Sequence, residues 1–170
     1  MTILETERLT LRQLTTDDAE FIFELLNDPS FIRNIGDRNI RTLDDAAAYV
    51  VNGPAASYAK NGFGLWLVAL KETNEPIGMC GLIRRETLED VDIGYALLPR
   101  FWSKGYAIEA AQATRDYAKD VVGLKRLVAI VDPVNEGSIR VLEKLGLHYE
   151  KMVRLSADDI DLKLFAIDFE

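Results

Sequence analysis

The segment at residues 97–111 contains the residues whose spacing is most suggestive of chemistry. It reads LLPRFWSKGYAIEAA, in which a strand-like run ends at Pro99, a loop contains Gly105, and a helical pattern follows. The first N–H groups of a helix have no partner within the helix and lie at the positive end of its dipole. Because such a helix end can bind phosphate, we expect an anion site here, supported by Arg100 and Lys104.

Two phosphate-binding patterns are excluded at this loop. A Walker A loop requires Gly-Lys-Ser/Thr in that order, whereas Lys104 here precedes Gly105. The dinucleotide-binding fingerprint requires three glycines at fixed spacing near the first strand. Gly105 would still let the backbone approach an anion closely, and the small Ala107 keeps the first helical turn uncrowded. Taken alone the pattern is weak, because a glycine near a helix start is more often simple punctuation.

A second segment makes the first more informative. Residues 135–147 follow the next strand-like run and read NEGSIRVLEKLGL. Together with the loop, this segment resembles the GNAT acetyltransferase superfamily. The acetyl-CoA motif of that family, Gln/Arg-x-x-Gly-x-Gly/Ala, is matched at Gly105 and Ala107, with Trp102 at its first position.

Further motifs resemble the branch that contains the ribosomal-protein N-terminal acetyltransferases. They are ERLTLR at 7–12, IGY at 93–95, and an Asn-x-x-Ser that begins at Asn135. The resemblance runs from about Thr6 to the C-terminus, with the motifs in the family's order.

The resemblance implies an N-acetyltransferase that uses acetyl-CoA and no metal. It implies direct attack of a primary amine, from a protein N-terminus or a small molecule, on the thioester, without a covalent enzyme intermediate. The residues that it assigns to cofactor binding are Leu97, Leu98, Arg100, Ser103, Lys104, Gly105, Tyr106, Ala107, Asn135 and Ser138.

The chain departs from the family pattern at two informative positions. Ser103 stands where the branch usually has glycine, which makes the loop stiffer by one residue. Leu142 stands where many members carry a tyrosine that protonates the leaving thiolate. The resemblance makes Ser138, in the first turn of the same helix, the expected substitute for that tyrosine.

An acetyltransferase also needs a base and an oxyanion site, because the attacking amine must be neutral and the tetrahedral intermediate carries a negative charge. Asp92 is the carboxylate that we expect as the base, although a solvated strand charge is the competing interpretation; Glu86 and Asp90 are weaker candidates. The family pattern places the oxyanion near the amides of residues 96–98. Cys80, which has no basic neighbour in sequence, is expected to be a buried strand residue, and His148 a surface or edge-strand residue.

The acceptor pocket is expected between residues 31–41 and the final hairpin loop at residues 156–161. Three aspartates in that loop, Asp158, Asp159 and Asp161, could recognise a cationic acceptor. A solvated turn is at least as good an explanation of this cluster.

Composition excludes several classes of protein. The chain has 170 residues, 48% of them hydrophobic, one cysteine, and a formal net charge of −8. An acidic surface disfavours nucleic acid and mildly favours cationic partners. The longest apolar run, at residues 63–70, is too short to span a membrane, and the N-terminus lacks the features of a signal peptide. We therefore expect a cytoplasmic protein.

The elements expected from hydrophobic periodicity form a single mixed α/β domain over residues 1–170. We expect a mostly antiparallel, seven-stranded sheet with a splayed parallel pair, and about four helices. The expected strands are 8–14, 62–70, 77–83, 91–98, 125–131, 147–155 and 162–169. The expected helices begin near residues 19, 42, 106 and 135. The strand–helix–strand unit at residues 91–131 supplies the parallel pair, because a crossover helix connects parallel strands.

Two other classes of function remain to be weighed. An acyl-CoA-binding sensor would keep the fold and the ligand but lack catalysis, and Leu142 leaves this alternative open. A nucleic-acid-binding or interaction module is disfavoured by the net charge of −8. The sequence does not decide whether the domain forms a homodimer through an edge strand.

Overall fold

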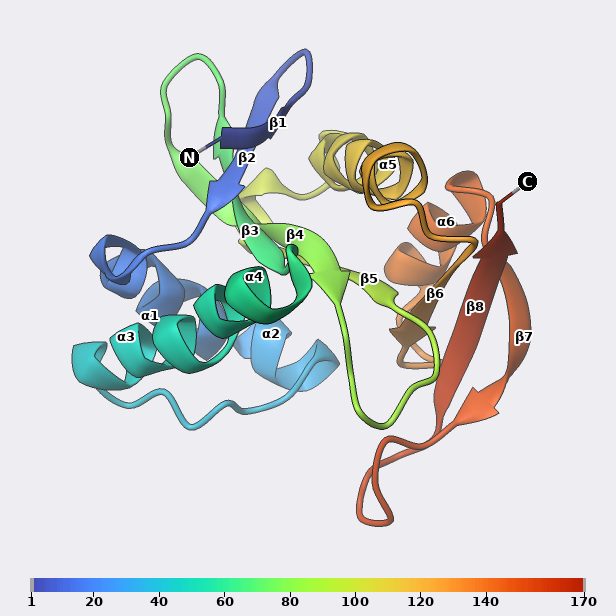
Figure 1. Ribbon diagram of the computed structural model, residues 1–170. Coiled ribbons are helices and arrows are strands. Elements are labelled where there is room, and N and C mark those ends of the chain that lie inside the picture. Colours follow the sequence, from blue (N-terminus) through green and yellow to red (C-terminus); the bar gives the residue numbers. More distant parts are fainter. Residues whose placement is uncertain (1, 170) are drawn as a thin grey trace.

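An eight-stranded sheet forms the centre of the computed structural model, which describes residues 2–169 (Figure 1). Its strand order is β1-β2-β3-β4-β5-β6-β8-β7. The strands are β1 (Thr2–Glu5), β2 (Leu9–Gln13), β3 (Leu65–Leu70), β4 (Pro76–Ile83), β5 (Asp92–Leu97), β6 (Arg126–Val131), β7 (His148–Val153) and β8 (Leu162–Asp168). Only β5 and β6 pair in parallel among the described strands, so the predicted fold class is confirmed.

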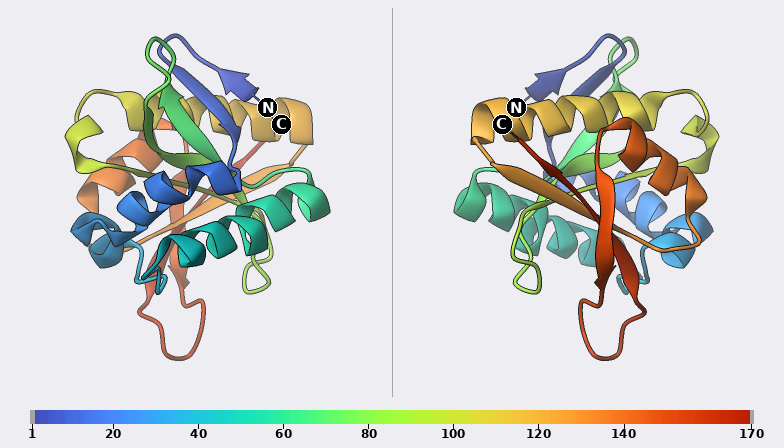
Figure 2. Two further views of the ribbon diagram at one scale, coloured as in Figure 1. Left: turned by 90° about the vertical axis from the view of Figure 1, so that its left-hand side faces the viewer. Right: turned by 90° about the vertical axis from the view of Figure 1, so that its right-hand side faces the viewer.

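Helices cover both faces of this sheet (Figure 2). They are α1 (Ala19–Asn27), α2 (Pro29–Asn34), α3 (Leu43–Asn52), α4 (Pro54–Asn61), α5 (Tyr106–Tyr117) and α6 (Glu136–Lys144). Short 3₁₀ turns lie at Thr16–Asp18 and Pro99–Phe101, and a π-turn at Ala118–Val122 extends α5 to the predicted end of that helix. None of the helices within residues 2–169 combines the length and the apolar character that crossing a membrane demands.

The side chains of β3 point alternately to the two faces of the sheet and contribute to two separate layers of the core. Trp66 and Val68 pack in the cluster that α5 and α6 cover, whereas Leu67 and Ala69 pack in the cluster beneath α1 and α3. Successive side chains of a strand point to opposite faces, and a continuous apolar run therefore serves both layers. The indole ring of Trp66 contacts the Tyr117 ring of α5 edge-on, with 5.2 Å between their centroids.

The structure contains one strand and two helices more than the sequence predicted. Pro29 does not merely end α1: it occupies the first turn of α2, and the side chain of Asp28 accepts a hydrogen bond from the Ser30 amide. Pro54 similarly opens α4. Proline is well tolerated at a helix start because its missing N–H would have had no partner there. The extra strand, β1, has only four residues, and its pairing with β2 contains a register shift. A strand this short and irregular has no clear alternating pattern in the sequence.

The parallel pair of β5 and β6 opens toward the carboxyl ends of both strands. Its register is recorded at a single pair, Asp92 and Val128. By contrast, β5 pairs with β4 along its whole length, and β6 does the same with β8. The confirmed parallel pair is therefore splayed, and the two strands leave an opening between them.

Candidate active site

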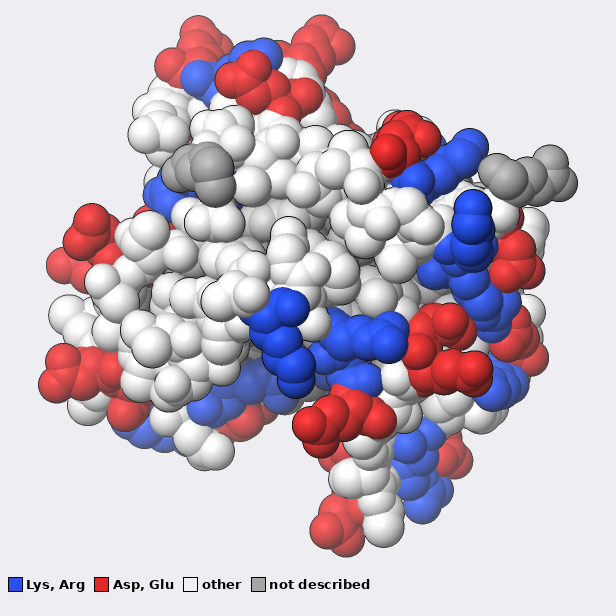
Figure 3. Space-filling model, viewed as in Figure 1, with Lys and Arg blue, Asp and Glu red and all other residues white. Residues whose placement is uncertain are grey.

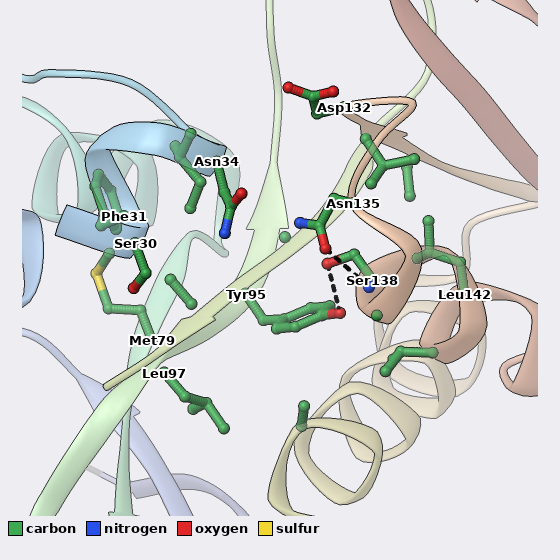
Figure 4. Close-up of a pocket in the computed structure, with 18 of the residues that line it drawn as sticks. Ser30, Phe31, Asn34, Met79, Tyr95, Leu97, Asp132, Asn135, Ser138 and Leu142 are labelled. Atoms are coloured by element: carbon green, nitrogen blue, oxygen red, sulfur yellow. Dashed lines mark hydrogen bonds between the residues drawn. The ribbon is translucent and has the colours of Figure 1, made fainter. Parts of the chain in front are cut away.

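A groove of about 800 Å³ runs through the opening between β5 and β6. Its walls come from α2, from β5, from the loop before α5, and from α6. In Figure 4, Phe31 and Asn34 lie on the α2 side, Ser138 and Leu142 lie on the α6 side, and Tyr95 extends between them. This volume falls in the range of small-molecule and cofactor sites, about 300–1,000 Å³.

The loop before α5 turns sharply at two left-handed residues. Ser103 has φ of 62° and Gly105 has φ of 83°. This conformation explains why glycine would suit position 103, since a side chain there is strained. Gly105 is the N-cap of α5 and provides no side-chain cap, and the first helical bond runs from the Glu109 amide to its carbonyl. The amides of residues 106–108 therefore precede the helical ladder at the edge of the groove.

Arg8 holds this loop from outside the groove. Its Nη1 donates to the Lys104 carbonyl at 2.9 Å, and its Nε pairs with Glu109 of α5 at 2.7 Å. The guanidinium also lies over the ring of Tyr106, 4.4 Å from its centroid. The Glu109 carboxylate additionally accepts from the Thr6 hydroxyl. The sequence placed Arg8 in a motif without a role, and the structure shows that it clamps the loop to the first turn of α5.

Some of the backbone hydrogen-bonding groups at the end of β5 already have partners. The Leu98 amide donates to the Ile77 carbonyl, and the Leu97 carbonyl accepts from the Trp102 indole, both at 2.9 Å. Hydrogen-bonding direction alternates along a strand paired on one side. The amides of Tyr95 and Leu97 therefore face away from β4 and toward the opening. Of the amides expected near the oxyanion, that of Leu98 is excluded, because it already donates within the sheet.

A polar cluster joins α6 to β5 across the opening. The hydroxyl oxygens of Tyr95 and Ser138 are 2.9 Å apart, and the Asn135 side chain accepts from the Ser138 amide at 3.2 Å (Figure 4). Burial raises the pKa of Tyr95 to about 12, against the opposing effect of the Ser138 hydrogen bond. Leu142 is buried beside this cluster. In the sequence, Tyr95 is part of the IGY motif at 93–95, and its hydroxyl group is the only local sign of a further role.

Asp92 lies where β5 and β6 begin to separate. Its side chain is 1% exposed and accepts from Arg85 Nε at 3.1 Å. Burial raises the pKa of Asp92 to about 6, although the Arg85 charge opposes that shift. The weaker candidates do not line the groove: Glu86 is exposed, and Asp90 pairs with Arg126. A carboxylate with this pKa can accept a proton near neutral pH.

The groove brings together most of the residues predicted from the sequence. Its walls include Asp92, Leu97, Ser103, Gly105, Tyr106, Ala107, Asn135 and Ser138. Three predicted residues lie elsewhere. Arg100 pairs with Glu24 at 3.3 Å and approaches Glu75 at 4.0 Å, on the outer surface. Lys104 is exposed outside the wall, and Leu98 is buried in the core beneath α1 and α3.

Of the two segments predicted to form the acceptor pocket, only residues 31–41 contribute to the wall of the groove. Arg33 and Arg38 line it, together with other residues of the segment at 31–41. From the final hairpin only Leu155 and Leu162 contribute; the carboxylates of the loop do not, and Asp161 pairs with Arg154 instead.

Cys80 and His148 lie where the sequence predicts, the first buried in a strand and the second on an edge strand. Cys80 is fully buried, and burial raises the pKa of its thiol to about 12. His148 is exposed on β7, which is an edge strand of the sheet. Neither residue lines the groove.

Comparison with known proteins agrees with this architecture. The family model described as an acetyltransferase (GNAT) domain matches residues 8–148. An uncharacterized N-acetyltransferase of Bacillus subtilis, YoaA, is 33% identical over 153 residues, which cover 89% of this chain and 86% of that protein. The crystal structure of an acetyltransferase from Agrobacterium tumefaciens superposes with a TM-score of 0.83 at 29% identity, covering 99% of this chain and 95% of that one.

The fold alone is shared with a more distant protein, RimL, a ribosomal L7/L12 alpha-N-protein acetyltransferase solved in complex with coenzyme A. The TM-score is 0.85 at 17% identity, and the match covers 99% of this chain and 98% of that one. The family match over residues 8–148 and the relatives at about a third identity establish that this chain belongs to the GNAT acetyltransferase family.

Proposed function

We propose that this chain transfers an acetyl group from acetyl-CoA to a primary amine. The observation that carries the proposal is the continuity of one groove. It extends from the uncapped start of α5 at Gly105, through the opening between β5 and β6, to Ser138 and Asp92. A pyrophosphate, a thioester and an amine require these surroundings in this order: a helix start, unpaired strand amides, and groups that transfer protons.

The cofactor would be held by backbone groups more than by cationic side chains. The amides of residues 106–108 would bind the pyrophosphate, with no contribution from Arg100 or Lys104, which lie outside the groove. The β5 edge at Tyr95, whose amide faces the opening, would pair with the pantetheine arm. The Asn135 amide nitrogen, which is turned toward the groove in Figure 4, would supply a further donor.

Four groups would then share the chemistry. Asp92 would accept the proton that the amine loses as its nitrogen bonds to the acetyl carbon. The Leu97 amide would stabilise the oxyanion that forms at the carbonyl. As the carbon–sulfur bond breaks, Ser138 would donate a proton to the thiolate. Tyr95 would hold the Ser138 hydroxyl and pass its own proton to it, and Tyr95 would then take a proton back from solvent.

A protein N-terminus is the acceptor that demands least of this machinery. The pKa of an α-amino group is about 7.7–8.0, whereas that of a lysine side chain is about 10.4. RimL, which shares the fold, acts on such a terminus according to its description. A small-molecule amine is the second candidate. The sensor alternative lacks a comparable argument, because the Tyr95–Ser138 pair supplies a hydroxyl where Leu142 cannot.

Gly105→Ala is expected to weaken acetyl-CoA binding about tenfold. A left-handed conformation costs an alanine about 1–2 kcal/mol, which is close to a tenfold change in an equilibrium. The new Cβ would also meet Arg8 Nη2 at 3.2 Å. If the loop relieves this strain by moving, the amides at the start of α5 move with it. Calorimetric titration of the folded variant with acetyl-CoA measures the change.

Gly123→Ala is the matched control. Gly123 follows the π-turn at the other end of the same helix, has φ of 80°, and has open space around an added Cβ. Its substitution should lower the melting temperature by a similar amount and leave acetyl-CoA affinity unchanged. If intact protein fails to bind acetyl-CoA at micromolar concentrations, the proposed function is wrong.

Arg8→Met is expected to weaken acetyl-CoA binding by about three- to tenfold. The variant loses the hydrogen bonds to Lys104 and Glu109, and a bond that involves a charged group contributes about 1.5–3 kcal/mol when intact. Part of this loss should appear as lower stability, and part as disorder of the cofactor loop. The measurement is calorimetry, combined with thermal unfolding.

Arg115→Met separates the two effects. Arg115 lies on α5 and, like Arg8, donates a hydrogen bond to a backbone carbonyl, that of Leu145, at 2.6 Å. It does not line the groove. The Arg115 variant should lose stability while binding acetyl-CoA normally. Equal affinities of the two variants would show that Arg8 is a structural residue only.

A further inference from the structure

Three arginines line the acceptor end of the groove. This end is separated from the cofactor loop by β5. Arg33 is on α2, Arg38 is in the segment between α2 and α3, and Arg85 follows β4. In Figure 3, basic side chains gather where the α2–α3 segment faces the loop between β4 and β5. This concentration of positive charge contrasts with the formal net charge of −8 of the whole chain.

The carboxylates near these arginines are already engaged. Asp28 accepts from the amide of Ser30, and Asp37 forms a two-point pair with Arg41 at 2.7 and 3.1 Å. Asp92 is bound by Arg85. The remaining carboxylates that line the groove, Asp132 and Glu136, belong to its α6 side.

Two of the three arginines therefore have no acidic partner in the part of the chain that the structure describes. Arg33 and Arg38 form no salt bridge within 4.0 Å to any carboxylate among residues 2–169. Both residues are exposed. An arginine beside a groove, with its donors unused, is available to a ligand.

Arg38 and Arg85 come from different elements, and both place positive charge near Tyr49. Burial raises the pKa of Tyr49, which also lines the groove, and the charges of Arg38 and Arg85 oppose that shift. All three residues line the groove, so this part of its wall carries the positive charge of both guanidinium groups. Arg38 is folded back toward Gly36, where an added Cβ would lie 3.6 Å from its Nη1.

We infer that this end of the groove recognises an anionic group on the acceptor, close to the amine that is acetylated. The inference rests on the proposed function and narrows its substrate class. Guanidinium groups bind carboxylate or phosphate through paired hydrogen bonds, and a groove with low-dielectric walls strengthens that attraction. The acceptor is then an acidic N-terminal peptide or a small amine that carries a carboxylate. The cationic acceptor favoured by overall charge is disfavoured here, because Asp28 and Asp92 are already engaged by the Ser30 amide and Arg85.

Matched pairs of acceptors test the inference. One pair is Ala-Asp-Ala amide and Ala-Asn-Ala amide, which differ in one carboxylate near an α-amine. The other is 5-aminopentanoate and 5-aminopentanol, which represent small molecules. We expect kcat/KM for the acidic member to exceed that of its neutral partner about tenfold in at least one pair, with coenzyme A release as the readout. The pair that shows the preference identifies the source of the anion.

The variant Arg33→Gln/Arg38→Gln should abolish this preference without changing acetyl-CoA affinity. Lys119→Gln removes a positive charge from the exposed π-turn, outside the groove, and should leave the preference intact. Equal rates within both pairs, no turnover of either acidic acceptor, or a preference that survives in the double variant would each overturn the inference. Failure of the proposed function is recognised separately, because acetyl-CoA itself would then not bind.

Discussion

Replacing Ser138 with alanine is expected to lower kcat for acetyl transfer about a hundredfold or more, while acetyl-CoA affinity changes little. General acid catalysis contributes about 10²–10⁴-fold, and Ser138 is the hydroxyl on α6 that lines the groove where the family's tyrosine is replaced by Leu142. The substitution preserves the fold of α6, because Asn135 accepts from the Ser138 backbone and not from its side chain. Steady-state kinetics with saturating acetyl-CoA measure the loss.

Tyr95→Phe distinguishes direct proton donation from positioning. The variant keeps the ring in the core and loses only the hydroxyl that lies 2.9 Å from Ser138 Oγ. We expect a smaller loss of kcat, about tenfold, and no further loss when both substitutions are combined, because groups that act as one unit are not additive. Ser156→Ala, in the loop between β7 and β8, is the control and should have normal kcat. A Ser138→Ala enzyme with wild-type kcat would rule out the proton-donor role.

Asp92→Asn is expected to lower kcat/KM at pH 7 about a hundredfold and to remove one limb of the pH profile. The ionised carboxylate is the form that accepts a proton. With its pKa raised by burial to about 6, Asp92 should add to the pH profile an acidic limb with its midpoint near pH 6, below the limb set by the pKa of the acceptor amine. The asparagine variant should lack this acidic limb. Its side chain has nearly the same shape, and its amide oxygen can still accept from Arg85.

The same pKa predicts a stability effect. Because the folded-state pKa of Asp92 lies above its ordinary value of 3.8, the folded protein binds more protons than the unfolded chain between about pH 4 and pH 6. The contribution of Asp92 to the free energy of unfolding is therefore present below pH 4 and is lost as pH rises through 6. Denaturant titrations of Asp92→Asn should lack this decline. Asp90→Asn, whose parent carboxylate pairs with Arg126 outside the groove, should keep both the decline and the acidic limb. An unchanged rate profile in Asp92→Asn would transfer the role of base to water or to another group.

Sequence alone determined the features whose causes lie within a few residues of one another. The loop at Gly105 and the helix after it were predictable, because a left-handed glycine and a helical apolar pattern are local signals. The parallel pair at residues 91–131 followed from the strand–helix–strand order, since a crossover of that length places the second strand beside the first. These signals were sufficient to bring Gly105, Asn135 and Ser138 to one groove.

Only the tertiary structure decided which side chains complete the site. Arg8 reaches Glu109 across 101 positions of sequence, and Tyr95 reaches Ser138 across 43. Such partners depend on strand order and side-chain direction, which no local pattern contains. For the same reason, proximity in sequence misplaced Arg100: it is five residues from Gly105, yet its charge is directed to Glu24 and Glu75. Composition described the surface as acidic, but the fold places Arg33 of α2 and Arg38 of the following segment on the wall of the groove. Local charge depends on which side chains the fold brings together.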